Sequence, residues 1–158
     1  MLRVTTKLSL VFFALLLIGA LPVLGEESPL ANMYVEYLKS EGYSPEVDKD
    51  GDVVFKYEGR TYYIGIDDDD PEFFIVVYPN FWEIESDAEK ELALEIARKV
   101  TDTKKLAKVH LSGQGTNVSV RAGTLLKEPE DFKHVLPRML NAIAIARQEF
   151  VKGMRGGD

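Results

Sequence analysis

The stretch PEFFIVVYPNFW, residues 71–82, decides the fold of this chain. Between about Glu72 and Pro79, apolar side chains stand at odd and even positions alike, which predicts a strand that is apolar on both faces. Helices of the same domain can cover one face of such a strand. The opposite face must then be covered by another part of the chain or be available to a partner.

The residues around this stretch predict further antiparallel strands. From Tyr43 to Phe81 apolar residues recur at every second position, and the breaks are short turns at Lys49–Gly51, Glu58–Gly59 and Asp67–Pro71. Short strands joined by short turns are typical of an antiparallel meander. Two more strands are expected at about Leu106–Ser112 and Asn117–Ala122, with these inward side chains: Ala107, Val109, Leu111, Val118 and Val120.

The first helix is bounded by three punctuating residues. Ser28 suits the N-cap, Pro29 suits the first helical position, and Gly42 suits the left-handed residue just past the end. Helical spacing between them predicts one apolar stripe made by Leu30, Met33, Tyr34, Tyr37 and Leu38.

Two further helices are expected downstream. One begins at the capping box Ser86-Asp87-Ala88-Glu89 and has the following inward stripe: Leu92, Ala93, Ile96, Ala97 and Val100. The last runs from about Pro129 to Lys152, and an interior proline, Pro137, predicts a kink or a restart there. Its inward residues are Phe132, Leu136, Met139, Ile143, Ala146 and Phe150.

These elements predict an α+β fold. The expected architecture is an antiparallel sheet of about five to six strands with helices packed on one face, in the order α-β-β-β-(β)-α-β-β-α. Residues 26–152 have the size of one domain, and residues 153–158 are expected to form a flexible C-terminal tail.

The first 25 residues read as a targeting segment. Arg3 and Lys7 precede an apolar run from Leu8 to Leu21, and the small Gly25 suits cleavage by a signal peptidase. The alternative is a membrane anchor formed by residues 8–24, at the short end of the lengths that span a bilayer. Gly19 and Pro22 favour processing over anchoring, so a periplasmic or secreted protein is expected.

Charge and cysteine content exclude several classes of protein. The 158-residue chain has a formal net charge of −7, and removal of the segment that carries Arg3 and Lys7 makes it −9. Such an acidic domain without a basic cluster is not suited to nucleic acid or to anionic lipid, so no membrane contact is expected after cleavage. With no cysteine, neither a disulfide framework nor a lipid-modified N-terminal cysteine is available.

Two acidic stretches raise the question of calcium. Asp48, Asp50 and Asp52 match the first ligands of an EF-hand loop, but Val53 stands where the loop needs glycine and Gly59 where it needs glutamate. A hairpin turn explains Asp50-Gly51 without an ion. In the run Asp67–Asp70 consecutive side chains point in opposite directions, which favours a solvated turn over a metal site.

Catalytic residues are scarce. Ser112 and Ser119 lack the glycine context of a nucleophile elbow, and the two histidines, His110 and His134, lie on different expected elements without metal-ligand spacing. Asn117-Val118-Ser119 matches a glycosylation sequon, but it lies within an expected strand. No catalytic residue, metal ligand or cofactor is therefore assigned.

The remaining functional candidate is an apolar surface. If Phe73, Ile75 and Val77 face the helices, the opposite sheet face carries an apolar strip beside a tryptophan, and such a strip often marks an interface. Its candidate partner-binding residues are Tyr63, Phe74, Val76, Tyr78 and Trp82. The alternative is that the last helix or the loop NFWEIES covers the strip within one chain.

Five segments resemble the YbjN-like proteins, which are labelled bacterial sensory-transduction regulators and share the type III secretion chaperone-like fold. They are YLKSEGY (37–43), DGDVVFKYEGRTYYIGID (50–67), DDPEFFIVVYPNFWEI (69–84), KLAKVHL (105–111) and FKHVLPRMLNAIAIARQEF (132–150). The resemblance covers most of residues 29–151 and implies no catalytic residues. It implies a small, often dimeric protein that binds an extended segment of a partner, although those chaperones act in the cytoplasm and lack an export signal.

Two functional hypotheses follow. The first is a non-catalytic, exported protein-binding or chaperone-like module with a regulatory role, which binds an unidentified protein or peptide and forms a homodimer. The second is a calcium-dependent or hydrolytic enzyme built on the acidic turns at 48–52 and 67–70. The lack of catalytic residues favours the first.

Overall fold

The computed structural model describes residues 28–157, so the expected targeting segment, residues 1–25, lies outside the described part. The elements are α1 (Pro29–Ser40), β1 (Glu46–Val47), β2 (Val53–Tyr57), β3 (Arg60–Gly65), β4 (Phe73–Glu83), α2 (Asp87–Thr103), β5 (Ala107–Ser112), β6 (Asn117–Leu125) and α3 (Phe132–Met154). Short 3-10 turns, η1 (Gly113–Gly115) and η2 (Pro129–Asp131), precede β6 and α3. The predicted α+β class and element order are confirmed. Among the described helices, none has the length and apolar character needed to cross a membrane.

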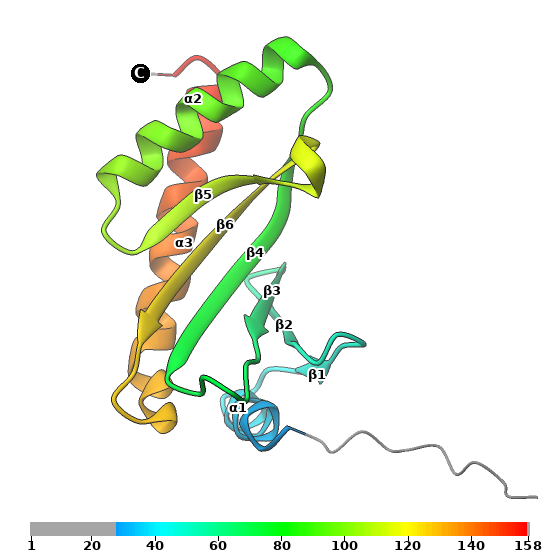
Figure 1. Ribbon diagram of the computed structural model, residues 1–158, viewed down its shortest axis with the longest axis vertical. Helices are drawn as coiled ribbons and strands as arrows, with labels where there is room; N and C mark the ends of the chain where they lie inside the picture. The colour runs from blue at the N-terminus through cyan, green and yellow to red at the C-terminus, as the bar shows by residue number, and fades with distance from the viewer. Residues whose placement is uncertain (1–27, 158) are drawn as a thin grey trace, which may run out of the picture.

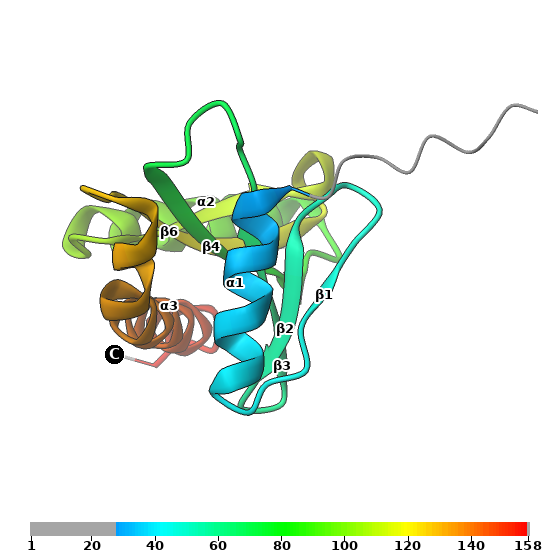
Figure 2. The same ribbon diagram turned by 90° about the horizontal axis from the view of Figure 1, so that it is seen from below.

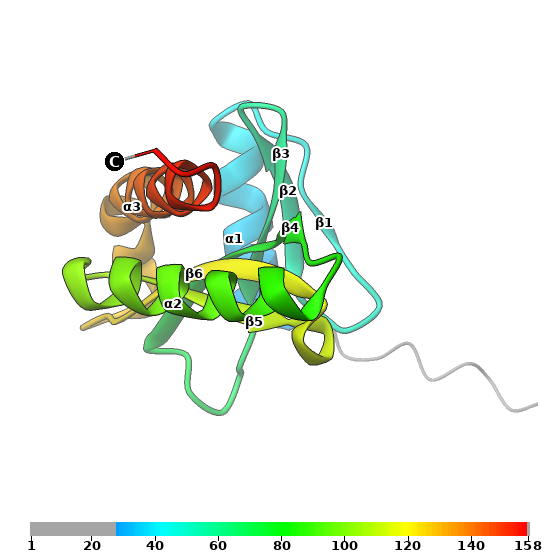
Figure 3. The same ribbon diagram turned by 90° about the horizontal axis from the view of Figure 1, so that it is seen from above.

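The six strands form one antiparallel sheet in the order β1-β2-β3-β4-β6-β5. The sheet bends between its two halves, and α1 and α3 lie in the hollow of the bend (Figures 2 and 3). The longest strand, β4, lies in the middle of the sheet and joins the halves (Figure 1). Within residues 28–157, no helix lies on the outer side of the bend along most of β3, β4 and β6 (Figures 1 and 3).

An aromatic cluster fixes the centre of the core. The fully buried ring of Phe74 on β4 lies 5.5 Å from the ring of Tyr34 on α1 and 5.7 Å from that of Phe132 on α3. The rings of Tyr34 and Phe132 lie 4.5 Å apart in an edge-to-face arrangement, a geometry that aromatic pairs favour. The predicted apolar residues of the last helix are all buried, which confirms its inward stripe.

The turn after β1 is a hairpin, as predicted. The backbone N–H of Asp48 donates to the carbonyl of Asp52 at 2.9 Å, and the Asp48 carboxylate accepts the N–H groups of Asp50 and Asp52. The Asp52 carboxylate accepts the N–H of Ile66 from the neighbouring strand connection. These carboxylates therefore satisfy backbone donors, which is the usual use of aspartate in turns.

Helix α2 covers one edge of the sheet. It packs against β5, the outermost strand, and the Thr101 hydroxyl both accepts the Val109 N–H at 2.9 Å and donates to the Val109 carbonyl at 3.1 Å. One side chain thus satisfies both backbone groups of an edge residue, so these groups are not free to pair with a further strand.

One prediction about the helices is wrong, and of the kink or restart predicted at Pro137 the restart does not occur. Leu92 is 42% exposed although it was expected to face inward, because covering a sheet edge needs only the narrow stripe that includes Ala93, Ile96 and Val100. Helix α3 continues through Pro137 without a restart. Pro137 and Lys133 lie on the solvent side of the helix, so water can satisfy the Lys133 carbonyl that loses its intrahelical donor.

Replacing Thr101 by valine is expected to destabilise the protein by about 1–3 kcal/mol, because the Val109 N–H and carbonyl lose their partners. The matched control is Thr103→Val, because the Thr103 hydroxyl donates only to the Val100 carbonyl of its own helix. Chemical denaturation of both variants tests this. Equal midpoints for the two variants would contradict the proposed role of Thr101 at the edge.

Candidate functional site

The structure reverses the expected faces of β4. Phe74 and Val76 have no exposed surface and face α1 and α3, whereas Phe73 is 39% exposed and Ile75 and Val77 are partly exposed. The predicted partner strip is therefore wrong for Phe74 and Val76, which are core residues. For these two residues, the alternative that the domain covers them internally is the correct one.

An apolar surface nevertheless exists on the opposite face and has different members. We define the outer strip as Tyr63, Phe73, Ile75, Val77 and Leu125. Tyr63 pairs across the sheet with Val77, and Phe73 pairs with Leu125, so these side chains are neighbours on one face. Leu125 is 73% exposed, the largest value among the exposed large apolar residues of the described chain.

Two glycines make room for side chains of the outer strip. A Cβ on Gly65 would stand 2.8 Å from a methyl carbon of Ile75, and one on Gly123 would stand 3.2 Å from the ring of Phe73. Both glycines pair with Ile75 on β4, Gly65 from β3 and Gly123 from β6. The absence of their side chains makes room for the side chains of Ile75 and Phe73 on this face.

Basic side chains flank the outer strip on two sides. Val77 pairs with the exposed Arg121, which pairs with the exposed Lys108 on β5. Val54 on β2 pairs with Tyr63, and Lys56, two residues further along β2, lies on the same face. In a strongly acidic chain, this face therefore presents apolar contacts between three cationic groups.

Trp82 and Tyr78, the other predicted strip residues, lie on the core side. The register between β4 and β6 shifts between Tyr78 and Trp82, and Asn80 within this bulge has a positive φ of 49°. The bulge places the rings of both Phe81 and Trp82 against Phe150 of α3, at 5.4 and 6.0 Å. The Trp82 indole N–H donates to the Glu89 carboxylate at 2.8 Å, so Trp82 helps to anchor α2.

A buried serine holds this bulge in place. The Ser119 hydroxyl accepts the backbone N–H of Asn80 at 2.9 Å and lies 2.7 Å from the Ser112 hydroxyl. The Ser112 hydroxyl also donates to the Asn80 side chain. These contacts give Ser112 and Ser119 a structural role. The sequon residue Asn117 donates its side-chain N–H to Thr116.

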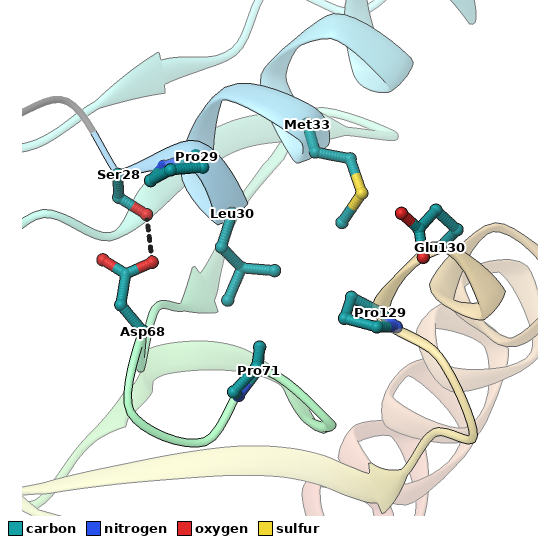
Figure 4. A pocket seen from close by; sticks show the side chains of 8 residues that line it. All are labelled: Ser28, Pro29, Leu30, Met33, Asp68, Pro71, Pro129 and Glu130. Atoms are coloured by element: carbon teal, nitrogen blue, oxygen red, sulfur yellow. Dashed lines mark hydrogen bonds between the residues drawn. The ribbon is translucent and has the colours of Figure 1, made fainter.

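A second surface feature was not predicted from the sequence. An open groove of about 670 Å³ lies between the start of α1, the β3–β4 loop and η2 (Figure 4). Its apolar walls are formed by Leu30, Met33, Pro71 and Pro129, and its two carboxylates belong to Asp68 and Glu130. The walls come from three segments that are far apart in sequence, so no local sequence pattern predicts the groove.

The two carboxylates of the groove stand on opposite walls (Figure 4). Asp68 accepts the Ser28 hydroxyl at 2.7 Å. Burial, together with the negative charge of Glu130, raises the pKa of Tyr34 to about 12. Tyr34 therefore stays protonated at physiological pH. Among residues 28–157, no lysine or arginine lines the groove.

The two histidines do not form a joint site. His110 on β5 is partly buried, and burial together with the nearby positive charge of Arg121 lowers its pKa. His134 lies on the exposed side of α3. Within residues 28–157, no group of three or more histidines and carboxylates is placed to hold a metal ion. In the 67–70 turn, the Asp67 carboxylate accepts the Asp69 N–H while Asp68 turns to Ser28.

Comparisons with known proteins support the fold alone. No family model matches the chain, and no curated protein matches it. A crystal structure of an uncharacterized protein from Methanothermobacter thermautotrophicus is similar, with a TM-score of 0.57 and 10% sequence identity. The similarity covers 80% of this chain and 97% of that protein. At this identity the similarity carries no functional information.

The two faces of β4 can be distinguished by one pair of variants. Phe74→Ala is expected to destabilise the protein by about 3–5 kcal/mol, because it removes a ring from the centre of the core. Phe73→Ala, the same change at the adjacent residue, should cost less than about 1.5 kcal/mol since its ring is partly exposed. Urea denaturation measures both, and a larger loss for Phe73→Ala would mean that the faces are assigned wrongly.

Proposed function

We propose that this protein is a non-catalytic polypeptide-binding module that uses the outer strip as its binding surface. The observation that carries the proposal is the combination of partly exposed apolar residues with a sheet face on which no helix of residues 28–157 lies along most of β3, β4 and β6. Contiguous apolar surface on a folded domain commonly marks a site of interaction.

The chemistry of the face favours a polypeptide as ligand. Leu125, which is 73% exposed, has enough free apolar surface to contribute about 1–2 kcal/mol when a partner covers it, and Phe73, which is 39% exposed, contributes less. Arg121 and Lys108 beside the strip would favour a partner segment that carries acidic residues next to apolar ones. A mostly apolar centre with a charged rim is the arrangement found in protein interfaces.

Two features of the sequence extend the proposal. The segment 1–25 has the pattern of an export signal, so we place the module outside the cytoplasm, in the periplasm or secreted. The YbjN-like resemblance is consistent with a regulatory or chaperone-like binding role and with a homodimer. The alternative enzyme would need the acidic turns to bind calcium, yet the Asp48 and Asp52 carboxylates already accept backbone N–H groups.

The test measures binding of an unfolded polypeptide, for which reduced and carboxymethylated α-lactalbumin with a fluorescent label serves as the probe. The double variant Phe73→Ser/Leu125→Ser should weaken binding at least tenfold, because it removes two of the large apolar contacts. Fluorescence anisotropy gives the dissociation constants, and circular dichroism verifies that each variant is folded.

The matched control is Leu94→Ser on α2, a leucine that is 50% exposed but lies away from the outer strip. This variant should bind as the wild type does. Failure of the wild type to bind the probe, or an equal loss in the control, would refute the outer strip as the binding surface.

A further inference from the structure

The groove between α1, the β3–β4 loop and η2 lies at the same end of the sheet as the most exposed part of the outer strip. Pro71 in the groove wall is two residues from Phe73, and Pro129 is four residues from Leu125. The Leu126 N–H also donates to the Glu72 carbonyl at 2.8 Å, which holds these two chain segments together.

From this geometry we infer that the groove binds a lysine or arginine side chain of the polypeptide partner. The inference rests on the proposed function only in taking a polypeptide as the ligand. Long basic side chains combine an apolar stem with a cationic head, and they bury the stem on apolar surface while the head reaches polar groups.

The groove matches both parts of such a side chain. Leu30, Met33 and the two proline rings of Pro71 and Pro129 supply apolar surface for the methylene stem (Figure 4). Asp68 and Glu130 stand on opposite walls and supply carboxylate acceptors for the head. A hydrogen bond between a cation and a carboxylate is stronger than one between neutral groups.

Charge also disfavours two competing occupants. If the segment that precedes Ser28 were the occupant of the groove, its Glu26 and Glu27 would bring negative charge against that of Asp68. An acidic segment of a partner would meet the same repulsion from Glu130. The positive groups flanking the outer strip and the negative groups of the groove therefore select opposite charges on different parts of a partner.

The methyl group of Met33 can report binding at the groove by NMR. Met33 lies in the groove, whereas Met139 is buried in the core and Met154 lies at the end of α3. The full chain, labelled with ¹³C at the methionine methyl groups, is titrated with three acetylated and amidated pentapeptides. The peptides have the sequence Leu-Ala-X-Ala-Leu, where X is lysine, glutamate or leucine.

The lysine peptide should shift the Met33 methyl signal saturably and leave the Met139 signal in place, with at least fivefold tighter binding than the glutamate peptide. Asp68→Asn/Glu130→Gln should abolish this preference, because it removes both carboxylates of the groove. The control Asp69→Asn/Glu36→Gln removes the same charge from exposed positions outside the groove and should keep the preference. Raising the salt concentration should weaken the preference.

Several results would overturn the inference. Equal binding of the three peptides, no shift of Met33, or loss of preference in the control double variant would each show that the groove does not recognise a cationic side chain. A Met33 shift that depends on protein concentration without peptide would assign the groove to a second copy of the chain. If the Met33 methyl signal does not shift while Phe73→Ser/Leu125→Ser weakens binding of labelled α-lactalbumin, this inference fails and the proposed function stands. If Met33 responds and the strip variant binds normally, the outer strip fails instead.

Discussion

The position of the Phe74 ring between Tyr34 and Phe132 is the contact on which the rest of the structure depends. Side chains alternate along a strand, so one residue placed in the core fixes the face of every other residue on that strand until a bulge intervenes. With Phe74 inward, the odd-numbered apolar residues from Phe73 to Val77 must point away from the helices. The outer strip is therefore a direct consequence of the core packing.

The bulge of β4 keeps this arrangement compatible with α2. The extra residues of β4 form a bulge at Asn80, which a hydrogen bond to Ser119 holds in place. Trp82 therefore returns to the core side, and its indole N–H donates to Glu89 at the start of α2. Helix α2 then covers the β5 edge through Thr101. Helix α2 thus covers one edge of the sheet, while the outer strip on the outer face stays accessible to a partner.

Much of this fold could be predicted from the sequence, because capping residues, turn residues and apolar periodicity are local signals. The hairpin at Asp48 and the start of α2 at Ser86 have this origin. The faces of β4 could not be predicted, since a strand that is apolar at every position has no alternation to read. The surface groove could not be predicted from the sequence either, because its walls at Met33, Asp68 and Pro129 meet only in the folded chain.

The central claim is that β4 presents one set of apolar side chains to the core and the other to solvent. Methyl NMR with a soluble gadolinium chelate tests it directly, because the chelate broadens only signals near the surface. We expect broadening at Ile75, Val77 and Leu125, and sharp signals at Ile64 and Val76. Broadening of Val76 with protection of Ile75 and Val77, in a dilute sample, would contradict the account.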